Sequence, residues 1–137
     1  MFIIIMKSNI LSDTRILVAS SEDIIRNFLK IELQNNGYQI LIARDGIEAL
    51  YMINTLNMTE SPFDLYLIDT SLKKLGYIKL IDKIKSVKAI KPVILLVNDL
   101  NLPIDYSRNK YQLIGMIQKP FLKEELLAQI AAFLGEK

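Results

Sequence analysis

Five short apolar runs alternate along the chain with longer stretches in which apolar residues recur at helical spacing. The runs are Arg15–Ala19, Tyr38–Ala43, Asp64–Ile68, Pro92–Val97 and Leu113–Ile117. They are rich in isoleucine, leucine and valine and too short for helices, so each is predicted to be a buried strand. Because strands that alternate with helices build parallel sheets, the pattern predicts an α/β domain with helices on both faces of the sheet.

Four stretches carry apolar stripes typical of helices that pack against a sheet. The stripes are formed by Ile24, Ile25, Phe28, Leu29, Ile31 and Leu33; by Ile47, Leu50, Tyr51 and Asn54; by Leu75, Ile78, Ile81 and Ile84; and by Leu122, Leu126, Ile130 and Phe133. Gly37 and Gly135 stand where a glycine commonly ends a helix. A short further helix is expected to start near Pro103, because a parallel crossover needs one.

Residues 1–14 precede the first predicted strand and are interpreted as a tail or an extra edge segment, with the domain itself spanning residues 15–135. Phe2–Met6 is apolar but far too short to cross a membrane or to form the core of a signal peptide. The protein is therefore expected to be cytoplasmic, with no membrane contact.

Composition excludes several kinds of chemistry. The chain of 137 residues has neither cysteine nor histidine, which excludes disulfides, thiolate metal sites and a histidine base or phosphohistidine. Its net charge of +2 is too small to indicate nucleic acid. Lysines crowd residues 73–91, and we interpret them as a solvated helix face.

Polar residues gather after the predicted strands, where parallel sheets bind ligands and place their chemistry. Ser20–Asp23 follow the first strand, Asp69 follows the third, Asn98 and Asp99 follow the fourth, and Lys119 follows the fifth. Ser20 and Ser21 are also interpreted as helix N-caps, since Ser20-x-x-Asp23 is similar to a capping box.

Five segments, in this order, resemble the receiver domain of bacterial response regulators. They are Arg15–Val18, Asn36–Tyr38, Ala43–Leu50, Asp64–Asp69 and Lys119–Leu126, and the resemblance extends from about Arg15 to Leu134. It implies a flavodoxin-like, doubly wound sheet of five parallel strands in the order 2-1-3-4-5. It also implies that Asp69 is the phosphoacceptor and that Lys119 contacts the acyl phosphate.

Four positions depart from the pattern of the family that the chain resembles. Ser20 and Ser21 stand where two adjacent carboxylates hold Mg²⁺, Val97 stands where a serine or threonine hydroxyl contacts the phosphoryl group, and Met116 replaces a switch tyrosine or phenylalanine. Asp69 and Glu22 remain as weak metal candidates. Because Mg²⁺ needs carboxylate oxygens, no metal ion and no other cofactor is expected, and Asp69 should pair directly with Lys119.

Three functions are consistent with the sequence. The leading hypothesis is a stand-alone, degenerate receiver, or pseudo-receiver, of two-component signalling that binds proteins independently of phosphorylation and is not an enzyme. The first alternative is a working receiver that a histidine kinase phosphorylates on Asp69, with an improvised Mg²⁺ site, and self-phosphorylation stays open. The second is a flavodoxin-like binder of small ligands through Ser20 and Ser21 at a helix N-terminus, which Glu22 and Asp23 disfavour by repelling phosphate.

The expected partner is a protein, either a histidine kinase or a downstream signalling protein. Homodimers are expected through the face formed by the helix near Pro103, the strand Leu113–Ile117 and the last helix. That face should include residues around Tyr106–Tyr111, Ile117 and Lys123. The crowded lysines are accompanied by no nucleic-acid recognition motif, so nucleic acid is not expected as a partner.

Overall fold

The computed structural model of the chain describes residues 13–56, 63–86, 91–99 and 114–135. The helix expected near Pro103, the proposed contact residues Tyr106–Tyr111 and most of the N-terminal segment lie outside the described residues. The described elements are β1 (Arg15–Ala19), α2 (Asp23–Asn35), β2 (Gln39–Ala43), α3 (Gly46–Leu56), β3 (Leu65–Asp69), α4 (Tyr77–Lys85), β4 (Val93–Val97), β5 (Ile114–Gln118) and α5 (Lys123–Phe133). All five predicted strands are confirmed, with ends that differ by at most one residue.

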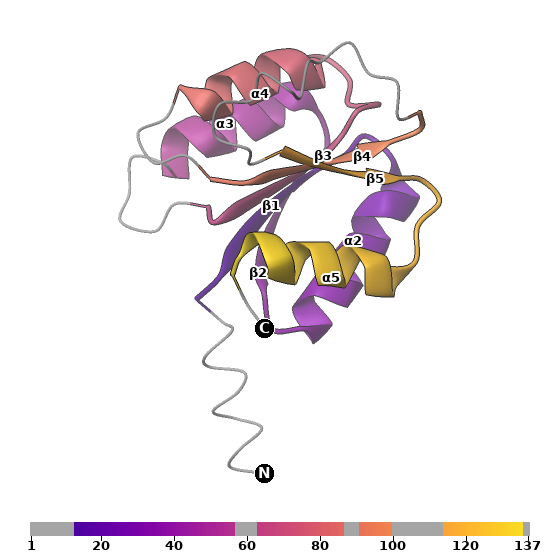
Figure 1. The fold of residues 1–137 in the computed structure, drawn as a ribbon. Helices are drawn as coiled ribbons and strands as arrows, with labels where there is room; N and C mark the ends of the chain where they lie inside the picture. Colours follow the sequence, from indigo (N-terminus) through magenta and orange to yellow (C-terminus); the bar gives the residue numbers. More distant parts are fainter. Residues whose placement is uncertain (1–12, 57–62, 87–90, 100–113, 136–137) are drawn as a thin grey trace.

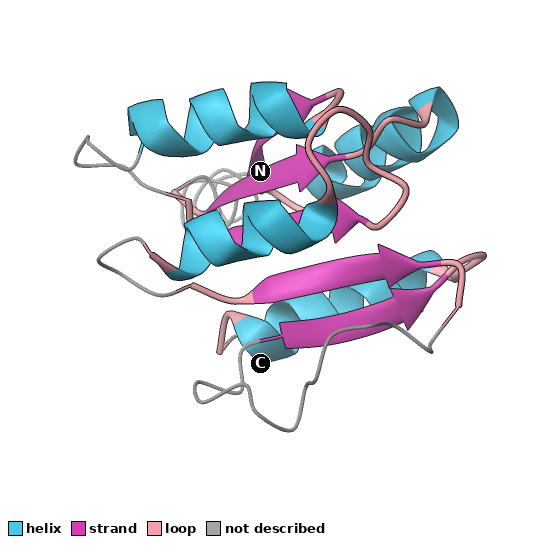
Figure 2. Ribbon diagram, turned by 90° about the horizontal axis from the view of Figure 1, so that it is seen from above, coloured by secondary structure: helices cyan, strands magenta, loops and turns pink. Residues whose placement is uncertain are grey.

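The five strands form one parallel sheet in the order β2-β1-β3-β4-β5, as the resemblance implied. Helices α3 and α4 cover one face, and α2 and α5 cover the other (Figure 1). All strands point the same way, so their carboxyl ends meet at a single edge (Figure 2). Among the helices that the structure describes, none is both long and apolar enough to cross a membrane.

Two apolar layers hold the helices on the sheet. Side chains alternate across a strand, so Leu17 of β1 packs toward Ala49 of α3, while Ile16 packs toward Leu29 of α2. The central strands β3 and β4 are buried at all their positions. Burial on both faces explains why these strands read as continuous apolar runs instead of alternating ones.

The predicted helix stripes are too wide, and one of them is misplaced. Ile24 of α2 and Leu122 before α5 are 82% and 71% exposed. In α3 the predicted stripe is Ile47, Leu50, Tyr51 and Asn54, of which Leu50 packs against the core and the other three are exposed. The buried face contains Gly46, Ala49 and Ile53. The helix lies close to the sheet through small residues, so the largest apolar side chains do not mark its buried side.

Two glycines end helices as predicted. Gly37 has a φ of 87°, and its N–H donates to the carbonyl of Gln34 while the N–H of Tyr38 donates to Leu33. This pair of hydrogen bonds is a Schellman motif, which closes α2 and turns the chain into β2. Gly135 has a φ of 73° and follows α5 in the same role.

Gly46, the first residue of α3, is required for a different reason. Its backbone approaches the loop before α4 so closely that a Cβ atom would lie 1.9 Å from the carbonyl oxygen of Leu75. Its N–H donates to the carbonyl of Lys73 at 2.9 Å. This close contact fixes the loop between β3 and α4 against the start of α3.

Replacing Gly46 by alanine should therefore lower the free energy of unfolding by about 2–3 kcal/mol, because the clash is with backbone and no side-chain rotation relieves it. Gly76, the N-cap of α4, has open space around its Cα and an ordinary φ of −70°. Gly76→Ser is the matched control. It should leave the free energy of unfolding unchanged or raise it by about 0.3 kcal/mol. Urea unfolding of both variants provides the measurement, and equal losses would contradict the role given to Gly46.

Candidate functional site

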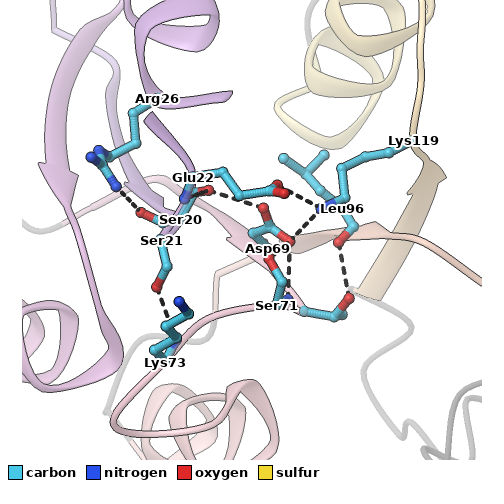
Figure 3. A network of polar contacts seen from close by, with 10 residues as sticks. Ser20, Ser21, Glu22, Arg26, Asp69, Ser71, Lys73, Leu96 and Lys119 are labelled. Carbon is cyan, nitrogen blue, oxygen red and sulfur yellow. Dashed lines mark hydrogen bonds and ion pairs between the residues drawn. The ribbon is translucent and has the colours of Figure 1, made fainter. Parts of the chain in front are cut away.

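Asp69 is the last residue of β3, at the edge where the carboxyl ends of the strands meet. Its side chain is fully buried, although it carries a carboxylate. Figure 3 shows Ser20 and Glu22 approaching it from the β1 side and Lys119 approaching from the end of β5. The sheet therefore brings together the residues that the sequence placed after three different strands.

Both oxygens of the Asp69 carboxylate accept hydrogen bonds from side chains. The Ser20 hydroxyl donates to Oδ2 at 2.9 Å. Oδ1 accepts from Lys119 Nζ at 2.8 Å, from the Ser71 hydroxyl at 2.8 Å and from the Ser71 N–H at 3.0 Å. Since each carboxylate oxygen offers about two lone-pair positions, Oδ1 has a full set of donors, whereas Oδ2 accepts one hydrogen bond.

Lys119 pairs with two carboxylates. Its Nζ lies 2.8 Å from Asp69 Oδ1 and 3.0 Å from Glu22 Oε2. The lysine side chain is 10% exposed, whereas Glu22 is half-exposed at the rim. The predicted direct pairing of Asp69 with Lys119 is therefore present, and Glu22 joins it from the solvent side.

The pKa values of the pair move in the directions expected for a formed ion pair. Burial alone raises the pKa of Asp69, but hydrogen bonds from Lys119, Ser71 and Ser20 outweigh it and hold this pKa below its ordinary value of 3.8. Burial likewise lowers the pKa of Lys119, but its bonds to Asp69 and Glu22 raise it above 10.5 overall. Both groups stay charged across the neutral range.

The helix N-cap predicted for Ser20 and Ser21 is wrong. Helix α2 begins at Asp23, its N-cap is Glu22, and no side chain caps it. The Ser20 hydroxyl instead accepts the N–H of Glu22 at 3.1 Å and donates to Asp69. The bond to the buried carboxylate fixes the position of this hydroxyl, and its contact with the N–H two residues later closes a local turn before the helix starts.

Ser21 connects three loops. Its hydroxyl donates to the carbonyl of Arg44, before α3, and accepts the N–H of Lys73, before α4 (3.0 and 2.9 Å). The contact with Lys73 is visible in Figure 3. The next residue, Lys74, has a left-handed backbone with a φ of 72°, and its Nζ lies 3.4 Å from Asp45. The loop that follows Asp69 is thus tied to both neighbouring loops.

The remaining predicted positions lie beside this network. Val97 ends β4 fully buried, and its carbonyl accepts the Lys119 N–H at 2.7 Å. Met116 is half-buried in β5 and packs on the apolar layer beneath α3 and α4. Neither side chain offers a hydroxyl or an aromatic ring at the site.

Sequence reasoning missed Ser71, which supplies two of the four hydrogen bonds to Asp69. A signal for it was present. Aspartate side chains commonly accept the N–H of the residue two positions later, and Asp69-x-Ser71 has that spacing at a strand end.

Metal-binding capacity can be judged from the donor set. Asp69 contributes one buried carboxylate, Ser20 a neutral hydroxyl, and Glu22 a half-exposed carboxylate that already contacts Lys119. Over the described ranges no group of three or more acidic, histidine or cysteine side chains is placed to hold a metal ion. Mg²⁺ in proteins keeps one or two carboxylates plus waters in an octahedron, and an ammonium 2.8 Å from the main carboxylate repels it.

Comparisons with known proteins agree with the fold. The family model described as the response regulator receiver domain matches residues 16–131. The uncharacterized transcriptional regulatory protein YkoG of Bacillus subtilis (strain 168) is 32% identical over 126 residues, covering 88% of this chain and 51% of that protein. The response regulator ArlR of Staphylococcus epidermidis is 30% identical, with coverages of 88% and 52%. The chain spans about half the length of these curated relatives.

Solved structures give the same result. The receiver domain of the Francisella response regulator 1452 is 26% identical, with a TM-score of 0.72, and the match covers 89% of this chain and 97% of that one. A CheY-like receiver domain protein from Methanospirillum hungatei JF-1 is 24% identical, with a TM-score of 0.75 and coverages of 89% and 94%. The likeness to the Methanospirillum hungatei protein supports a shared fold and nothing beyond it.

Removing the Asp69 charge should destabilise the domain. Asp69→Ala leaves Ser20, Ser71 and Lys119 with unsatisfied donors and should cost about 3 kcal/mol, while Asp69→Asn keeps one acceptor oxygen and should cost about 1–2 kcal/mol. In a pocket of three carboxylates the same changes would relieve repulsion and stabilise. Urea unfolding at neutral pH without metal measures the sign of the change in unfolding free energy. A gain in stability for Asp69→Asn would refute the ion-pair interpretation.

The pH dependence should identify the same carboxyl. Because folding lowers the pKa of Asp69, its contribution to stability is present above pH 3.8 and is lost as pH falls through the lower folded pKa. The difference in unfolding free energy between wild type and Asp69→Asn should be constant from about pH 5 to 8 and should narrow below about pH 4. The pKa of Asp45 is also lowered, chiefly by the N–H of Glu48. Both proteins contain Asp45, so its effect on the pH dependence cancels in the difference. A difference that widens in acid would contradict this assignment.

Proposed function

The chain belongs to the response regulator receiver domain family, and from that premise we propose that it is an atypical receiver that works by binding a protein partner independently of phosphorylation. The observation that carries the proposal is the hydrogen bond from the Ser20 hydroxyl to Asp69 Oδ2. A neutral donor occupies the position where a working receiver would carry a carboxylate for Mg²⁺. Asp69 then serves as one half of a permanent ion pair.

The charge of the site argues against metal-assisted phosphoryl transfer. That reaction needs a divalent ion to neutralise the oxygens that gather charge in the transition state. Replacing two carboxylates by Ser20 and Ser21 removes two negative charges, and each unit charge at about 4 Å is worth about 4 kcal/mol at an effective dielectric of about 20. Glu22 is held by Lys119 at 3.0 Å and would have to leave it to bind a metal.

The state of the nucleophile points in the same direction. To attack a phosphorus atom, a carboxylate oxygen of Asp69 must exchange hydrogen bonds for a new covalent bond. Oδ1 accepts from Lys119 and twice from Ser71, and Oδ2 accepts from Ser20. Both oxygens are therefore stabilised in the unreacted anion, which lowers their nucleophilicity.

The route by which a phosphoryl group would change the surface is also altered. In the family pattern a hydroxyl after the fourth strand and an aromatic side chain in the fifth respond to phosphate. Val97 and Met116 take those two positions, and both pack with apolar neighbours. We infer that the surface holds one conformation, set by packing.

A second candidate function is a working receiver that a histidine kinase phosphorylates on Asp69. It is favoured by the retained Asp69–Lys119 pair at the end of β3 and by relatives whose names describe response regulators. Under this alternative Mg²⁺ would be required, and Glu22 would have to turn from Lys119 toward the metal. The two candidates give opposite results with a small phosphodonor.

Incubation with acetyl phosphate and Mg²⁺ should leave the intact mass of the wild-type protein unchanged. Amide chemical shifts of residues 93–99 and 114–120 should also stay the same, because no phosphoryl group is accepted. A gain of one phosphoryl mass, with shifts in these segments that Asp69→Asn abolishes, would establish the working receiver and overturn the proposal.

Restoring the missing carboxylates provides the matched positive experiment. Ser20→Asp with Ser21→Asp places three carboxylates at the strand ends, so the double variant should bind Mg²⁺ saturably and be less stable without it. Ser21→Asp alone tests the site if the buried Ser20 does not tolerate a larger side chain. Mg²⁺ titration followed by amide shifts should show binding that Asp69→Ala removes. Equal Mg²⁺ binding by the wild type would refute the loss of the metal site.

A further inference from the structure

Helices α3 and α4 expose apolar side chains that nothing in the described chain covers. Ile47 and Tyr51 lie one turn apart on α3 and are 58% and 69% exposed, and Ile78 in the first turn of α4 is also exposed. The two helices lie side by side on one face of the sheet (Figure 1), and Gly46 and Leu75 bring their starts into contact. A shallow hollow of about 210 Å³ lies at the start of α4, lined by Leu75, Tyr77 and Ile78 together with Lys74 and Lys79.

Positive charge is concentrated beside these apolar residues. Residues 73–86 contain five lysines and one carboxylate, a net charge of +4, whereas the whole chain has a net charge of only +2. Lys79, Lys83 and Lys85 are exposed on α4, and Asp82 is the one carboxylate of that helix. We call the surface formed by Ile47, Tyr51, Ile78, Lys79, Lys83 and Lys85 the lysine-flanked apolar face.

Two kinds of side chain on one face define what fits it. The apolar residues Ile47 and Tyr51 are spaced i, i+4 on α3, and α4, which carries the exposed lysines, lies beside α3 on the same face of the sheet (Figure 1). A helix with apolar residues on one side and carboxylates along its edge would cover the first and pair with the second. We propose that the lysine-flanked apolar face binds an acidic amphipathic helix of a partner protein.

Two other occupants fit less well. A second copy of this chain in a two-fold dimer would bring two copies of the same positively charged surface together, and like charges repel. Nucleic acid would match the charge but would leave Ile47 and Tyr51 against phosphates. Neither occupant matches both the apolar side chains and the lysines of this surface.

The inference deepens the proposed function by naming the chemistry of the partner, and it rests on that function only in assuming that the chain acts by binding protein. The two can fail separately. Phosphorylation of Asp69 would overturn the proposed function without changing the surface of α3 and α4. A failure of the peptide experiment below would leave the results with acetyl phosphate untouched.

The test uses a displayed library of peptides of about 14 residues, roughly four helical turns. Apolar residues are fixed at helical i, i+4, i+7 and i+11 positions, and the other positions vary among Glu, Lys, Gln and Ala. Selection on the 137-residue chain should enrich glutamate over lysine at the variable positions. Amide shifts caused by a selected peptide should map to residues 46–55 and 74–85.

Charge reversal on α4 supplies the decisive variant. Lys79→Glu with Lys83→Glu should weaken a selected peptide at least about tenfold, and Tyr51→Ser should weaken it by a similar factor. Lys30→Glu with Lys123→Glu makes the same change in charge on α2 and α5, across the sheet, and should change affinity less than about twofold.

Several outcomes would overturn the proposal. These are a library with no preference for glutamate, a peptide whose shifts map to α2 and α5, and equal weakening by the two charge reversals. Tight binding of a mixed-sequence oligonucleotide that Lys79→Glu with Lys83→Glu abolishes, or a dimer in sedimentation that the same variant dissociates, would assign the face to the competing occupants.

Discussion

The buried ion pair of Asp69 and Lys119 is the interaction on which the carboxyl edge of the sheet depends. A carboxylate at a fully buried position costs several kcal/mol unless it is paired and hydrogen-bonded, and here Lys119 pairs with it while Ser20 and Ser71 donate hydrogen bonds to it. These donors come from loops that follow β1, β3 and β5. Each loop is therefore held in place by the need to satisfy one charge.

Ser20 and Ser21 determine the hydrogen bonding at this edge of the sheet. A carboxylate at position 20 would repel Asp69 and attract a cation, whereas the Ser20 hydroxyl donates a hydrogen bond to it at 2.9 Å. At position 21 the hydroxyl both donates and accepts, joining Arg44 to Lys73, which an ionised carboxylate could not do. Under the proposed function, the same two serines replace a metal site, and Ser21 builds a connection between loops.

Sequence was sufficient for the sheet and insufficient for the details of the site. The strands were predictable because burial on both faces demands runs such as Tyr66–Ile68, and Gly37 was predictable because only a left-handed residue closes α2 in this way. The face of α3 was not, since its buried side uses Gly46 and Ala49, whose small side chains carry little hydrophobic signal. The cap expected at Ser20 failed because a carboxylate 49 residues away competes for its hydroxyl, and such competition is invisible to local patterns.

The site and the lysine-flanked apolar face are mechanically connected. Ser21 holds the N–H of Lys73, Lys73 accepts the N–H of Gly46, and Gly46 begins α3 while the same loop leads into α4. A phosphorylated receiver would be free to move the loop after its aspartate, and both helix starts would then shift with it. Here the hydroxyl of Ser21 and the hydrogen bonds from Ser71 to Asp69 hold that loop. Under the proposed function, these contacts would keep the relative position of α3 and α4 constant, and a surface of constant shape suits a protein that binds its partner without a covalent signal.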